Sequence, residues 1–182
     1  MTSTVATTNQ NTPALAGSAN AFAAAGSELG GSALPILKLS KAGAWVFGAE
    51  NTPVTRTDTP FAADVQGVMR GFVCFVDGDV VDEVLVPVAS GKGISRGDLA
   101  DHGPYEEGDG WAESASMQLR SVETGEEFCF KPTSHGGRSA IGALLKQFGY
   151  RLNVGKAGFP IVDLGVGSYE HKRYGKVFKP VF

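Results

Sequence analysis

The sequence predicts a β-rich α+β fold, specifically an OB-like antiparallel β-barrel that carries one helix. The main observation is a period-two alternation of apolar and polar residues over most of 34–131, with hairpin signals at Asp77-Gly78 and Thr124-Gly125. The pattern changes once to a helical period, over 138–148, and then returns to strand-like segments. Several antiparallel strands, one late helix and two final strands are the order expected of a small barrel. An α+β sheet with one packed helix is the competing architecture.

Residues 1–33 form a low-complexity leader that is predicted to be disordered. They are mostly Ala, Thr, Ser, Asn and Gly, and Glu28 is their one charged residue. So little apolar surface cannot offset the entropy lost when a chain becomes ordered. The folded domain is therefore expected to occupy residues 34–182. The chain has no apolar run of about 18 residues and no Lys or Arg before Lys38, which predicts a cytoplasmic protein with no membrane partner.

Within the domain, most segments are expected to be strands. Residues 90–112 are rich in glycine and acidic residues and have no apolar period, so they are expected to form a long exposed loop. Apolar residues recur at helical spacing over 138–148, and Gly149 is expected to end that helix. The expected strands are 34–39, 45–47, 65–76, 80–86, 114–122, 126–131, 159–166 and 176–181.

Charge is distributed very unevenly along the chain. Residues 129–182, here called the basic segment, contain nine Lys or Arg and two acids, a net charge of +7. The other 128 residues contain seven Lys or Arg and 17 Asp or Glu, a net charge of −10. Eight of the 17 aromatic residues also lie in the basic segment. A groove for single-stranded nucleic acid needs this combination, because cations neutralise phosphates and flat rings stack on bases.

A phosphate-binding site is predicted at the start of the helix, in the segment Thr133-Ser-His-Gly-Gly-Arg138. Unpaired backbone N–H groups and the positive end of the helix dipole point out of such a start, and arginine can hold a phosphate with two hydrogen bonds. The alternative is that Ser134 caps the helix and the glycines form a turn. The expected phosphate-binding residues are Ser134, Gly136, Gly137 and Arg138.

The last part of the chain interleaves tyrosines with cations. Tyr169 and Tyr174 flank a run of charged residues, and a strand over 176–181 would place Lys176, Phe178 and Pro180 on one face. Rings would stack on bases and cations would contact phosphates, or the same residues would form a solvated hairpin whose rings cover the core. The residues expected to bind nucleic acid are Trp45, Lys131, Arg138, Lys146, Tyr150, Arg151, Lys156, Tyr169, Lys172, Arg173, Tyr174, Lys176 and Phe178.

The sequence contains no motif that indicates catalysis or a cofactor. The helix start lacks the Gly-Lys-Ser/Thr of a Walker loop, and CxxC metal-ligand spacing is absent. Cys74 and Cys129 each lie in an apolar strand-like run and are expected to be reduced core residues. We therefore expect a non-enzymatic protein with no catalytic residue, no metal and no cofactor.

The predicted acidic loop could also affect binding. Its acids are Asp98, Asp101, Glu106, Glu107, Asp109 and Glu113, and they would compete with nucleic acid if the loop faced the basic segment. The alternative is a solvated surface loop that only favours solubility.

Three segments carry a resemblance to known proteins. They are 37–45 (LKLSKAGAW), 134–144 (SHGGRSAIGAL) and 162–182 (VDLGVGSYEHKRYGKVFKPVF). Together they resemble a broad group of small, mostly uncharacterised phage and prophage proteins. The resemblance implies a phage-encoded protein of a replication or recombination module, located in the cytoplasm of the host cell.

The function expected from these observations is binding of single-stranded DNA. RNA is left open as a ligand, and so are a homo-oligomer and phage or host replication proteins as partners. The alternative function is a phage protein-interaction module, either an inhibitor of a host factor or a self-assembling virion component, in which the uneven charge would steer association.

Overall fold

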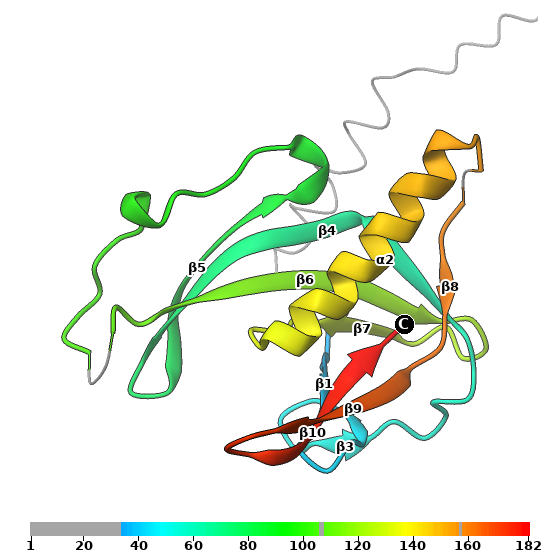
Figure 1. Ribbon diagram of the computed structural model, residues 1–182, viewed down its shortest axis with the longest axis horizontal. Coiled ribbons are helices and arrows are strands. Elements are labelled where there is room, and N and C mark those ends of the chain that lie inside the picture. Colours follow the sequence, from blue (N-terminus) through cyan, green and yellow to red (C-terminus); the bar gives the residue numbers. More distant parts are fainter. Residues whose placement is uncertain (1–33, 106–107, 157) are drawn as a thin grey trace, which may run out of the picture. The chain divides into compact units, whose positions relative to one another are not determined.

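The computed structural model describes residues 34–105, 108–156 and 158–182. The leader predicted for 1–33 lies outside the described residues. The described part of the chain is one β-rich unit in which a curled, open sheet holds a single α-helix, α2 (Figure 1). The predicted combination of many strands with one late helix is confirmed.

The main sheet follows the order β3-β2-β1-β7-β6-β4-β5, and a short strand, β8, pairs with the start of β4. Neighbouring strands are antiparallel, except that β1 and β7 are parallel. The end strands β3 and β5 do not pair with each other in the described residues, so the sheet forms a half-barrel and a closed OB-like barrel is not confirmed. The strands are β1 (Ile36–Leu39), β2 (Trp45–Phe47), β3 (Thr52–Pro53), β4 (Phe61–Val76), β5 (Asp79–Pro87), β6 (Trp111–Ser121), β7 (Glu127–Phe130) and β8 (Ile161–Val162).

The long strand β4 provides the curvature of the sheet. Its pairing with β6 shifts register between Asp64 and Met69, where the Gly67 N–H donates a hydrogen bond to the Asp64 carboxylate (2.9 Å). At Gly71 a Cβ atom would lie 2.0 Å from the carbonyl oxygen of Val84 on β5, so glycine is required for this close approach. Bulges and glycines bend a strand, which lets one sheet wrap around a helix.

The predicted hairpin between β4 and β5 is confirmed. Asp77 and Gly78 both have positive φ angles, 53° and 88°, as a two-residue type I′ turn requires.

Helix α2 (His135–Asn153) is longer than the sequence predicted. Ala140, Ile141, Leu144 and Phe148 face the core, as their spacing indicated. The prediction that the helix ends at Gly149 was wrong. The helix ends beyond Asn153, where Gly155 adopts a left-handed conformation (φ 72°) and its N–H donates to the Leu152 carbonyl, an arrangement typical of helix C-termini.

A separate hairpin follows the helix and is formed by β9 (Gly165–His171) and β10 (Gly175–Val181). The predicted single strand over 159–166 is instead divided between β8 and the start of β9. An aromatic cluster joins the hairpin to the main sheet, because Phe182 packs against both Trp45 on β2 and Phe130 on β7.

The segment predicted as an acidic loop contains two short 3₁₀ turns, Val88–Ser90 and Arg96–Asp98, and β6 begins at Trp111. Arg96 binds the Asp109 carboxylate with two hydrogen bonds, at 2.8 and 2.6 Å, and these hold the pKa of Asp109 below its ordinary value. The loop is therefore fixed by specific contacts, although its Glu106 and Glu107 lie outside the described residues. Within the described residues, no helix has the length and apolarity needed to cross a membrane.

Candidate nucleic-acid interface

The start of α2 combines a side-chain cap with unpaired backbone donors. The Ser134 hydroxyl accepts a hydrogen bond from the Gly137 N–H (3.2 Å), as the capping alternative predicted. Within the part of the chain that is described, the N–H groups of His135 and Gly136 have no recorded partner. The first turn of the helix therefore has both a cap and free donors that an anion can reach.

The two glycines at this start have different roles. A Cβ atom on Gly137, which is buried, would lie 2.3 Å from the Cβ of Pro132, so packing alone explains why glycine stands here. A Cβ atom on Gly136 would lie 3.3 Å from the Cβ of Lys179 on β10. Gly136 therefore lies next to the side chain of Lys179, whereas Gly137 lies against Pro132.

The same contact brings the final hairpin to the start of the helix, although Gly136 and Lys179 are far apart in sequence. The hairpin is held there by its inner face, where the Phe178 ring lies against Gly43 and Pro180 is buried. Trp45 adds a hydrogen bond from its indole N–H to the Gly165 carbonyl (3.3 Å). We call the residues 133–138 together with the whole hairpin, residues 165–181, the helix-start site.

The turn of the hairpin carries an ordered group of rings and cations. The His171 ring stacks on the Tyr174 ring with centroids 4.8 Å apart, and its Nδ1 accepts hydrogen bonds from the N–H groups of Arg173 and Tyr174. The Arg173 guanidinium lies over the Tyr174 ring, 5.5 Å from its centroid. Tyr174 is 68% exposed and Tyr169 is 46% exposed, so both rings remain accessible to a ligand.

The cations of the hairpin have no acidic partners among the described residues. Lys176 lies over the Phe178 ring (5.2 Å), and no salt bridge is formed by any hairpin cation in residues 34–105, 108–156 and 158–182. These side chains can therefore neutralise phosphates without first breaking an ion pair. They are Lys172, Arg173, Lys176 and Lys179.

Two other predicted cations are already paired. Arg138 forms an ion pair with Glu113 on β6 and donates from Nε to the Thr133 carbonyl (3.2 Å). Lys131 pairs with Glu83 on β5. Acids from the negative part of the chain thus do reach the basic segment. Glu113 is one of the acids counted with the predicted loop, although it lies on β6, and Glu83 lies on β5.

Trp45 cannot stack on a base in this structure. Its side chain is only 3% exposed, and its ring packs against Phe130 and Phe182 in the core. Phe178 also faces inward, because it contacts Gly43 and lines a cavity with Leu37 and Phe130. Both aromatic residues position the hairpin and are unavailable as stacking platforms.

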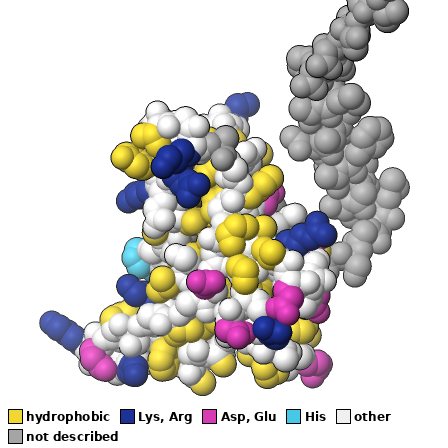
Figure 2. Space-filling model, turned by 90° about the vertical axis from the view of Figure 1, so that its right-hand side faces the viewer, with side chains coloured by type: hydrophobic (Ala, Val, Ile, Leu, Met, Phe, Trp, Pro, Cys, Tyr) yellow, Lys and Arg dark blue, Asp and Glu magenta, His cyan; other side chains and the backbone are white. Residues whose placement is uncertain are grey.

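The remaining predicted residues lie elsewhere. Lys146, Tyr150, Arg151 and Lys156 lie on the later turns of α2 or just beyond it. A helix of 19 residues is roughly 27 Å long at 1.5 Å per residue, so these side chains do not join the helix-start site. On the face shown in Figure 2, Lys and Arg occupy separate places with hydrophobic and acidic side chains between them.

Sequence reasoning missed Glu83, the partner of Lys131, and the ring of His171, which stacks on Tyr174. Glu113 comes directly before the predicted strand 114–122 and was counted with the acids of the predicted loop, but no local signal marked it as the partner of Arg138. The pairing depends on how β6 lies against the helix.

Other chemistry has little support in the described part of the chain. Cys129 lies near Lys131 and Glu83; burial raises the pKa of its thiol and Glu83 raises it further, while Lys131 opposes this. A thiol with a raised pKa is a poor nucleophile near neutral pH. No group of three or more His, Cys, Asp or Glu side chains is arranged to hold a metal within the residues described.

No protein-family model, curated protein or solved structure matches this chain.

Proposed function

We propose that the protein binds single-stranded DNA at the helix-start site, without catalysing a reaction. The observation that supports this most strongly is the adjacency of Gly136 and Lys179. This contact puts the start of α2, with its free N–H groups, next to β10, the strand that leads to the unpaired cations of the hairpin turn. Two accessible tyrosines lie on the same hairpin. This is the combination of anion-binding groups and stacking rings that single-strand binders use.

The proposed interface is smaller than the sequence suggested. Phosphates would bind to Lys172, Arg173 and Lys179 and to the first turn of α2, while bases would stack on Tyr169 and Tyr174. OB-like folds also bind single strands, and an OB-like mode of binding is part of the proposal, with the ligand on the separate hairpin and the helix start instead of across the main sheet. An origin in a phage replication or recombination module, acting in the host cytoplasm, is supported by the three resembling segments alone.

The test is a fluorescence anisotropy titration with a labelled oligothymidylate of roughly 20 nucleotides, which exceeds a typical site of about 4–16 nucleotides. It is run at about 50 and about 200 mM salt, with an oligouridylate of equal length in parallel. Binding that weakens as salt rises is expected, and the comparison of the two oligonucleotides decides between DNA and RNA. Absence of binding to either at the lower salt would overturn the proposal.

A second candidate is a protein-interaction module, which the other end of α2 favours. The residues 150–156 and 158–161, here called the helix-end segment, expose several large apolar side chains: Tyr150, Leu152, Val154, Phe159 and Ile161. Exposed apolar side chains close together often mark a protein contact. Sizing at low and high salt without oligonucleotide separates the two candidates, because self-assembly in the absence of nucleic acid supports the interaction module.

A further inference from the structure

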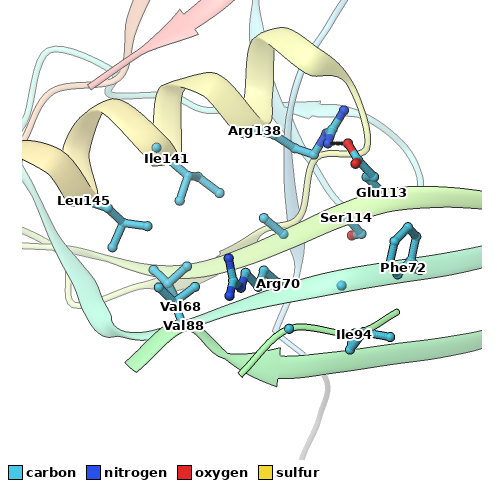
Figure 3. A pocket seen from close by; sticks show the side chains of 14 residues that line it. Val68, Arg70, Phe72, Val88, Ile94, Glu113, Ser114, Arg138, Ile141 and Leu145 are labelled. Carbon is cyan, nitrogen blue, oxygen red and sulfur yellow. Dashed lines mark hydrogen bonds and ion pairs between the residues drawn. The ribbon is translucent and has the colours of Figure 1, made fainter. Parts of the chain in front are cut away.

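A cavity of about 410 Å³ lies between α2, the strands β4 and β6, and the loop that follows β5 (Figure 3). Figure 3 shows the helix side chains Ile141 and Leu145 on one side and the strand side chains Val68 and Arg70 on the other. The cavity shares Arg138 with the helix-start site and shares no residue with the helix-end segment. Its size is within the range of sites for small molecules, which is about 300–1,000 Å³.

One part of the cavity wall is apolar. Val68, Ile141 and Leu145 line it from the sheet and the helix, and Val88 and Ile94 line it from the loop. These side chains form a site for a compact apolar group and shield that group from water on several sides. Gly93 and Gly142 also line the cavity, and a Cβ atom at either position would meet no atom within 4 Å. The space beside both glycines is open.

The polar part of the wall has a net positive charge. Arg70 and Arg138 are the cations, and Glu113 is the single acid among the lining residues. Arg138 is paired with Glu113, whereas Arg70 makes its recorded hydrogen bond from Nη2 to the Lys92 carbonyl (2.9 Å), which leaves its charge without an acidic partner among the described residues. Arg70 is exposed, so an anion can reach its guanidinium and gain a charge-assisted hydrogen bond.

One lining residue has an unsatisfied polar group. Ser114 is 3% exposed, and its hydroxyl has no hydrogen-bond partner in the part of the chain that is described. Leaving a buried hydroxyl unpaired costs about 1–3 kcal/mol, so buried polar groups of this kind normally have a partner. In the register of β4 and β6, Arg70 is paired with Ala115 and Gly71 with Ser114, so the Ser114 side chain lies on the other face of the sheet from Arg70 and the proposed ligand does not depend on it.

We propose that this cavity binds a small organic anion, with a compact apolar body against Val68, Ile141 and Leu145 and one anionic group at Arg70. The inference is separate from nucleic-acid binding, because the ligand is different and the residues that would contact it, Arg70, Val68, Ile141 and Leu145, are not part of the helix-start site. A carboxylate and a phosphate monoester share the required chemistry, and the experiment compares them.

The first experiment uses anilinonaphthalene sulfonate, a fluorescent aromatic anion, with the full chain. Gly142→Leu places a side chain in the open space of the cavity, so it should weaken probe binding by about tenfold or more. The matched control is Gly149→Leu, since Gly149 is on the same helix with open space beside it but does not line the cavity. The control should leave the affinity within about twofold of the unmodified protein.

Gly93→Leu is an independent variant that fills the cavity from the loop side, and it should have the same effect as Gly142→Leu. Circular dichroism establishes that each variant is folded. If both filling variants are folded and bind the probe as tightly as the control, the proposal is overturned. If the control loses as much affinity as they do, the probe binds to other apolar surface and the proposal is also overturned.

The second experiment tests the charge by displacing the probe with octanoate, octyl phosphate and neutral octanol. Either anion should displace the probe at lower concentration than octanol, and the better anion identifies the preferred group. Arg70→Gln should weaken the anion by about tenfold, the effect of losing a hydrogen bond to a charged group, and leave octanol unchanged. Equal displacement by octanol and both anions would contradict an anion site.

Discussion

The two ends of α2 have similar side chains and different surroundings. Each end combines cations with an exposed tyrosine: Tyr174 at the helix-start site is 68% exposed, and Tyr150 at the helix-end segment is 69% exposed. At the start, the hairpin adds more cations and another ring, and the helix adds its unpaired N–H groups. At the end, the neighbours are apolar side chains and the helix presents its carbonyl groups, whose partial charge repels an anion.

This difference teaches that composition alone did not identify the interface. Nine Lys or Arg in the basic segment are divided between both ends of the helix, and acids from other strands hold two of them. An anion-binding surface requires cations that are close together and unpaired. At the helix-start site the hairpin cations form no salt bridge among the described residues, whereas the helix-end segment lies at the negative end of the helix dipole.

The largest effect is expected from replacing Trp45, which holds the hairpin of the helix-start site against the main sheet. Trp45→Ala should lower the free energy of unfolding by about 3–5 kcal/mol, because a buried ring and its contacts with Phe130 and Phe182 are lost. Urea denaturation followed by circular dichroism measures this. Ile161→Ala, at an exposed position of the helix-end segment, is the control and should change stability by less than about 0.5 kcal/mol.

The next effect compares the two tyrosines directly. Tyr174→Ala should weaken binding of the oligothymidylate by about tenfold, since a stacked base contributes about 1–3 kcal/mol. Tyr150→Ala should leave it within about twofold, because that ring, although equally exposed, lies at the other end of the helix. Tyr169→Ala should resemble Tyr174→Ala. Equal losses from Tyr150→Ala and Tyr174→Ala would show that the interface is not confined to the helix-start site.

A smaller effect is expected for single cations. Arg173→Ala should reduce the magnitude of the slope of log K against log salt by about 0.7, the contribution of one phosphate on a single strand. Arg151→Ala removes an exposed arginine from the far end of the helix and should leave the slope unchanged. Titrations at four or more salt concentrations give both slopes, and a larger change for Arg151→Ala would reverse the assignment of the two ends.

The smallest effect concerns the acid that neutralises Arg138. Glu113→Gln should tighten DNA binding by up to about fivefold at low salt, since a partly exposed ion pair is worth about 0–1 kcal/mol and its loss frees the guanidinium. Glu123→Gln is a suitable control, because Glu123 is also exposed and paired with an arginine, Arg56, outside the basic segment. Weaker binding by Glu113→Gln would mean that the pair supports the shape of the site more than it competes with phosphate.

Much of the local structure could be predicted from the sequence. The Asp77-Gly78 turn was recognised because few residues accept two positive φ angles in succession, and the buried face of α2 because apolar residues recur every three to four positions. The prediction placed the end of the helix at Gly149, but the helix continues to Asn153. An isolated glycine within a helix costs only about 1 kcal/mol and does not by itself end it.

Tertiary structure decided which of the predicted residues come together. The sequence determined that the chain is β-rich with one helix, that its C-terminal third is basic, and that a capped helix start stands in that third, because these properties depend on periodicity, charge and residues that are neighbours. It could not determine that Lys179 lies beside Gly136, that Glu113 pairs with Arg138, or that Trp45 is enclosed by Phe130 and Phe182. Those contacts join residues distant in the chain, and they form only when the curved sheet and the hairpin pack around the helix.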